Sequence, residues 1–187
     1  MATTNIDAKN VTAGKPKATG AVFRAPAGTA LPTDASTSLN IAFKSLGYVS
    51  EDGITSSNTK TSEEIKEWGG SVVMTVQTEA SAAFEMTFIE SLNAEVLKLV
   101  FGDANVTESG GALTVSADGT ESQPQVFVIE MVVTGGRAMR IVIPNGKISE
   151  VGDVEYTAGG AVGYPVTIAA LPDTNGKFYY EYVTAAN

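Results

Sequence analysis

The sequence predicts a mainly β protein, a β-sandwich or partly open barrel with one flanking α-helix, an extended N-terminal arm and a long early loop. Segments 72–79 and 82–90 alternate between apolar and polar residues, as strands do when one face packs. Asn-Gly and Asp-Gly pairs mark tight turns in the second half of the chain. We therefore expect an arm over residues 1–38 and one domain over residues 39–187.

The arm is rich in Thr, Ala, Gly and Pro, and we expect it to be extended apart from one short strand at Ala21–Arg24. Its basic residues include Lys15, Lys17 and Arg24, whereas the whole chain has a net charge of −9. A basic arm beside an acidic body favours contacts between copies of the chain. A solvated tail without a role is the simpler alternative.

The domain begins with a predicted strand at residues 45–50, followed by a polar segment predicted to be a loop over residues 51–70. Within that loop, Thr61 or Ser62 ahead of Glu64 has the pattern of a capping box, which predicts one helical turn. The single Trp of the chain, Trp68, stands at the end of the loop before two glycines. Such a loop has no core of its own, so it is available for a partner.

The two strands after the loop are predicted to have one apolar and one polar face. The predicted polar face consists of Thr75, Gln77, Glu79, Glu85 and Thr87. A face of this kind normally meets solvent.

One helix is predicted at about residues 91–101, since apolar residues recur there at helical spacing. Ser91 or Asn93 is suited to cap its start, and Gly102 is suited to end it. The remainder is predicted to be β. The predicted strands are 112–117, 123–133, 137–144, 146–158, 164–172 and 177–183, with hairpin turns at Asp118-Gly119, Asn145-Gly146 and Asn175-Gly176.

The composition argues against catalysis. The chain has no His and no Cys, which excludes His-based triads and a thiol nucleophile. Glu63 and Glu64 form a carboxylate pair, but in a polar loop nothing separates their pKa values. We expect no enzyme activity, no cofactor and no metal. The apolar stretch Val126–Val133 is interrupted by Glu130 and is too short to cross a membrane, and the acidic charge disfavours phosphate binding.

Three segments in order, 62–73, 84–102 and 140–173, resemble the major tail tube proteins of bacteriophages with long, non-contractile tails. The resemblance extends from about residue 20 to the end of the chain. It implies a tube-forming β fold whose subunits form hexameric rings, which stack into a hollow tube. The tube assembles around a tape-measure protein in the host cytoplasm, meets terminator and tip proteins at its ends, and conducts DNA during ejection. The protein would then belong to the virion tail.

The resemblance also assigns residues to contacts. It implies that the long loop binds a neighbouring subunit, becoming ordered on assembly. The implied loop contacts are Ile54, Glu63, Glu64, Ile65 and Trp68, and the N-terminal arm contacts expected from charge are Lys15, Lys17 and Arg24. The predicted polar face would line the lumen, because like charge lets DNA pass without adhering. For Trp68, a place in the core is the alternative.

Two other functions stay open at this point. An immunoglobulin-like β-sandwich acting as an adhesin or virion decoration protein would use the long loop to bind its ligand. A hydrolase based on buried carboxylates would need a carboxylate pair in a concave pocket, and the strand faces offer none.

Overall fold

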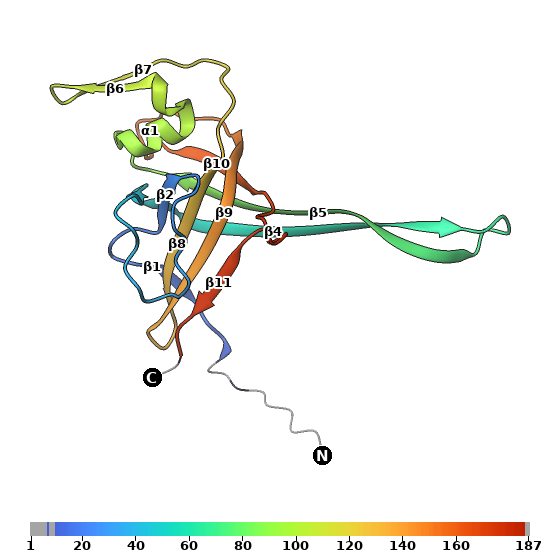
Figure 1. The fold of residues 1–187 in the computed structure, drawn as a ribbon. Helices are drawn as coiled ribbons and strands as arrows, with labels where there is room; N and C mark the ends of the chain where they lie inside the picture. Colours follow the sequence, from blue (N-terminus) through green and yellow to red (C-terminus); the bar gives the residue numbers. More distant parts are fainter. Residues whose placement is uncertain (1–6, 8–9, 186–187) are drawn as a thin grey trace.

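The computed structural model describes residue 7 and residues 10–185, and in that part of the chain it has a mainly β fold with one α-helix (Figure 1). The helices are α1 (Ala94–Phe101) and the short 3-10 helix η2 (Asp103–Asn105). The strands are β1 (Gly14–Pro16), β2 (Val22–Pro26), β3 (Lys44–Ser45), β4 (Val49–Lys66), β5 (Val72–Phe88), β6 (Val106–Ser109), β7 (Ala112–Val115), β8 (Gln125–Val133), β9 (Arg137–Val151), β10 (Tyr164–Ala170) and β11 (Tyr180–Val183). The predicted fold class is confirmed.

Nine strands form one antiparallel sheet in the order β3-β2-β8-β9-β10-β5-β4, with β1 also paired to β8 and β11 to β9. The long strand β9 connects two halves of this sheet, because residues 139–142 pair with β11 and residues 146–151 pair with β10. The sheet does not close into a barrel: its path ends at β3 on one side and at β4 on the other. Strands β6 and β7 form a separate ribbon.

Strand β8 is buried on both faces, which explains its nearly continuous apolar sequence. Phe127 and Ile129 point into the main core, to which α1 also contributes buried residues. Val126 and Val128 point the other way, into a smaller core with Phe43. Residues 27–43, which we call the cover loop, contribute Leu39, Ala42 and Phe43 to this second core.

Helix α1 starts and ends where local signals place it. The Asn93 side chain accepts a hydrogen bond from the Glu95 amide at 3.0 Å, and the Gly102 amide bonds the Lys98 carbonyl at 2.9 Å. Gly102 has a φ of 96°, which favours glycine. Leu92, one of the apolar residues at helical spacing, is 82% exposed, because it precedes the cap and lies outside the helix.

The N-terminal segment is not a free arm over its described length. The predicted short strand is confirmed as β2, and both β1 and β2 pair with β8 in the main sheet. Val22 and Ala25 are buried there. Small residues give a weak periodic signal in the sequence, so their burial could not be predicted. It results from the pairing of β2 with β8.

The segment 51–70 is not a loop, and the predicted helical turn within it is wrong. Residues 51–66 belong to strand β4, and residues 67–70 belong to the turn that follows it. Strand β5 is one continuous strand where two strands were predicted. The predicted strand 45–50 divides at Gly47, whose φ is 72°. Thr is common in strands, but β4 carries polar residues on both faces, so its sequence shows no apolar–polar alternation.

Of the three predicted hairpin turns, one forms a tight turn and none connects two strands that pair with each other. Asn145-Gly146 lies within β9, so the hairpin predicted there is wrong. Asp118-Gly119 lies in an irregular segment and joins no paired strands. Asn175-Gly176 does form a tight turn, with Gly176 at a φ of 71°, but β10 and β11 on either side pair with other strands. Strand β6, which was not predicted, pairs with β7 across Gly110 and Gly111.

Candidate functional site

Strands β4 and β5 form a long two-stranded hairpin that projects from the body (Figure 1). Ala82 is the last buried residue of β5 toward the tip, and residues 72–81 are exposed. At a rise of ~3.3 Å per residue, this exposed part of the strand is about 33 Å long. An extended ribbon with both faces in solvent contributes nothing to the core of its own subunit.

The root of the hairpin is held firmly by the body. The Asn58 amide donates a hydrogen bond to the Tyr179 hydroxyl at 2.8 Å. The rings of Tyr179 and Phe84 meet edge to face with centroids 5.3 Å apart. Ile54, predicted to contact a neighbour, is half-buried and packs against its own core instead. These contacts fix the direction in which the ribbon projects.

The hairpin tip is an ordered turn over residues 67–71. The Gly70 amide bonds the Glu67 carbonyl at 2.8 Å, and the Glu67 amide bonds the Ser71 carbonyl at 2.9 Å. Hydrogen bonds from the backbone amides of Gly69 and Ser71 lower the pKa of the Glu67 carboxyl below its usual value. Trp68 is fully exposed at this turn, so its placement in the core is wrong.

Apolar side chains gather near the tip of the hairpin. The register pairs Ile65 with Met74 and Glu63 with Val76, so these four side chains share one face. The exposed apolar residues of the tip are Ile65, Trp68, Val72, Val73, Met74 and Val76. We call this set the apolar tip. Ile65, Met74 and Val76 lie together on one face of the hairpin, and exposed apolar side chains grouped in this way are typical of an interaction site.

The predicted polar face of β5 is not continuous. Ser62 pairs with Gln77 and Thr61 pairs with Glu79, so Thr78 is an extra residue in a β-bulge. Because the bulge inverts the alternation, Thr75 and Gln77 lie on the face opposite Glu79. Glu85 and Thr87 follow Glu79 on its face, at the root of the hairpin; Glu85 is exposed and Thr87 is half-buried.

Of the three basic residues predicted to contact a neighbour, two are bound within their own subunit. Lys15 is exposed on β1. Lys17 donates to Glu130 at 3.0 Å. Arg24 is buried and forms ion pairs with Glu95 at 2.8 Å and Asp103 at 2.7 Å, which ties β2 to α1 and η2. A buried guanidinium needs such partners, so Arg24 is a structural residue rather than an arm contact.

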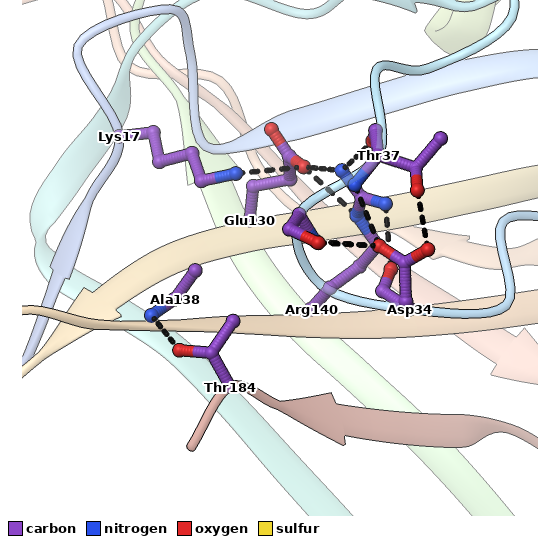
Figure 2. Close-up of polar contacts among 8 residues, drawn as sticks. Lys17, Asp34, Thr37, Glu130, Ala138, Arg140 and Thr184 are labelled. Carbon is purple, nitrogen blue, oxygen red and sulfur yellow. Dashed lines mark hydrogen bonds and ion pairs between the residues drawn. The ribbon is translucent and has the colours of Figure 1, made fainter. Parts of the chain in front are cut away.

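A second buried ion pair fastens the cover loop to the sheet (Figure 2). Arg140, 1% exposed on β9, donates to Glu130, 5% exposed directly opposite on β8. Its remaining guanidinium donors reach the carbonyl oxygens of Asp34 at 2.6 Å and Thr37 at 2.8 Å. One side chain therefore joins two strands and a loop about a hundred residues away in sequence.

The cover loop is shaped locally by Asp34. Its carboxylate accepts hydrogen bonds from the amides of Ser36 and Thr37, each at 2.6 Å, and from the Thr37 hydroxyl. These bonds, led by that of the Thr37 hydroxyl, lower the pKa of Asp34 well below its usual range. The turn presents the two carbonyl oxygens to Arg140 (Figure 2). Sequence reasoning missed Arg140, although a charged residue in each of two neighbouring apolar strands was a usable signal.

The described residues were searched for metal-binding groups and for membrane-spanning helices. No group of three or more His, Cys, Asp or Glu side chains there could hold a metal ion. None of the helices in that same part of the chain is long and apolar enough to cross a membrane.

A mainly β body that carries a projecting two-stranded ribbon with an apolar tip is typical of a subunit in a protein assembly. The family comparison agrees: the model of the family "Phage tail tube protein" matches residues 6–186. The chain belongs to this family of structural virion proteins, whose members assemble into a tube. No curated protein matches the sequence.

Proposed function

We propose that this chain is the subunit of a phage tail tube, forming rings, with six subunits each, that stack into a hollow conduit for DNA. The observation that supports the proposal best is the apolar tip, since an ordered ribbon with exposed Trp68 needs a binding surface. The hairpin contacts proposed are Glu63, Glu64, Ile65 and Trp68 on a neighbouring subunit. The protein has no catalytic role and uses no cofactor in this proposal.

The test is electron microscopy of the purified full-length chain over a range of concentrations. Hollow tubes or stacked rings support the proposal, and averaged end views give the number of subunits in a ring. Monodisperse single domains at every concentration contradict it. That outcome favours an immunoglobulin-like binding module, in which the hairpin would contact another protein.

Replacing Trp68 with Ala is expected to impair tube growth and leave the subunit folded. The indole is fully exposed, so its loss removes no contact within the chain, whereas buried aromatic anchors cost about 2 kcal/mol or more at interfaces. Sedimentation measures the assembled fraction, and circular dichroism measures folding. Replacing Tyr48, another exposed aromatic residue, with Ala is the matched control and should leave assembly unchanged. Normal growth of the Trp68→Ala tubes would show that the tip is not an interface.

We also propose that Glu79 and Glu85, which share a face, line the lumen. Replacing both with Lys is expected to permit assembly but hinder DNA passage, because cations attract phosphates that carboxylates repel. DNA ejection from particles built with the variant measures this, with Glu79→Gln/Glu85→Gln as the charge-neutral control. Normal ejection by the lysine variant would remove these residues from the lumen.

The remaining partners proposed are those of a tube assembled in the host cytoplasm. A tape-measure protein occupies the lumen during growth, and terminator and tip proteins bind the two ends. DNA passes through without specific binding, as the acidic composition favours.

A further inference from the structure

A groove of about 470 Å³ lies between β2, β3 and α1, on the body of the subunit. Its lining includes the charged residues Arg24, Lys44, Glu95, Lys98 and Asp103 and several Ala and Pro residues, among them Ala27. Ala and Pro form a shallow apolar floor, and Ile41, which is 91% exposed, lies next to it in the chain. This is a surface on which a flat apolar group can rest.

The groove carries more positive than negative charge. Arg24, Lys44 and Lys98 face two carboxylates, Glu95 and Asp103. Arg24 and Lys98 bind those carboxylates, whereas Lys44 is exposed and its side chain has no hydrogen bond or ion pair among the described residues. The groove therefore retains a solvated cation, without an ionic partner among the described residues, beside an apolar floor.

The hairpin tip is acidic and apolar, which complements the charge and the apolar floor of the groove. Its acidic residues Glu63, Glu64 and Glu67 outnumber its one base, Lys66. Trp68 stands at the turn with its indole in solvent. An indole is the best aromatic partner for a cation, and a desolvated contact of this kind is stronger than an exposed one.

The grooves at the root of the hairpin have the opposite charge. One is lined by Asp52, Glu85 and Glu150, and the next by Glu51, Asp52, Asp153 and Glu155, with no Lys or Arg in either lining. Like charges across an interface disfavour association. An acidic tip would be repelled there and attracted to the groove at β2 and α1.

The hairpin cannot fill the groove of its own subunit. It projects from the side of the body away from β2 and α1 (Figure 1), and its root is fixed by Asn58 and Tyr179. We propose that the groove at β2, β3 and α1 receives the hairpin tip of a second copy of this chain, with Trp68 on the apolar floor and the tip carboxylates beside Lys44. This inference rests on the proposed self-assembly and identifies where the tip binds.

Disulfide trapping tests the contact directly, because the natural chain contains no Cys. Ser71→Cys at the tip is combined with Ala27→Cys in the groove, and assemblies are formed under mild oxidation. A matched control combines Ser71→Cys with Ser50→Cys beside the acidic grooves. The groove pair is expected to give at least about tenfold more linked dimer, since proximity raises the effective concentration to the millimolar range. Equal or reversed yields would overturn the groove assignment.

Charge reversal gives an independent test. Lys44→Glu is expected to raise the concentration needed for assembly by about tenfold, and Glu63→Lys/Glu64→Lys in the same chain is expected to restore it. Lys177→Glu, an equal charge change on an exposed turn, should have no effect. If the wild type assembles and Lys44→Glu assembles as well as it, only the groove assignment fails. If the wild type never assembles, the proposed function fails.

Discussion

Replacing Arg140 with Met is expected to lower the free energy of unfolding by about 3–5 kcal/mol, the usual cost of removing one partner from a buried ion pair. Glu130 would stay buried with Lys17 as its remaining ionic partner. The carbonyl oxygens of Asp34 and Thr37 would lose their guanidinium donors, and the cover loop would lose these two hydrogen bonds to β9. Urea unfolding followed by circular dichroism measures the loss.

Two variants separate the ion pair from simple packing. Arg140→Lys keeps the charge but not the planar fork that bonds Glu130 and two carbonyls together, so it should still destabilise the fold. Arg140→Met combined with Glu130→Met should recover much of the loss, because no unpaired buried charge remains. Equal stability of the wild type and Arg140→Met would mean that the cluster shown in Figure 2 does not hold the cover loop.

The same cluster shows what the sequence could not predict. Glu130 interrupts an apolar run, and that interruption alone does not reveal its partner. The pairing with Arg140 follows from the β8–β9 register, and the bonds to residues 34 and 37 bring together segments far apart in the chain. Long-range contacts of this kind depend on the packing of the whole sheet, which local sequence patterns do not predict.

Local sequence signals predicted the structure correctly where that structure depends on interactions within one short segment. Asn93 and Gly102 bound α1 because their bonds are made within a few residues. Strand β10 falls within the predicted strand 164–172, and burial alternates along it. The hairpin was mistaken for a loop because β4 is polar on both faces, and its conformation comes from pairing with β5 rather than from burial.

The residues of the candidate site were also predicted only in part from the sequence. Trp68, Ile65, Glu63 and Glu64 were predicted to be available for a partner, and the structure exposes all four on the hairpin. Met74 and Val76 alternate with polar residues, as residues on a packed face do, yet both are exposed because this part of β5 lies beyond the body. Alternation identifies which residues share a face, but not whether anything covers that face.

Removing the distal hairpin is expected to abolish assembly and leave a folded monomer. Replacing residues 60–80 with Asn-Gly joins Thr59 to its register partner Ser81 through a two-residue turn, and it keeps Asn58 and Ala82 at the root. Every residue removed is exposed, so the thermal midpoint should change little. Sedimentation velocity should find monomer at concentrations about a hundredfold above those at which the wild type assembles, since several anchors are lost at once.

A full-length polar variant distinguishes the length of the ribbon from the chemistry of its tip. Ile65→Ser, Trp68→Ser, Met74→Ser and Val76→Ser together keep the hairpin and remove its main exposed apolar surface. If the apolar tip drives assembly, this variant fails as completely as the truncated chain, because backbone pairing within the ribbon offers a neighbour nothing to bury. If the polar variant still forms tubes and only the truncated chain fails, the ribbon acts through its backbone edge, as an added strand on a neighbouring sheet. Tubes formed by the truncated chain would move the assembly contacts to the body itself.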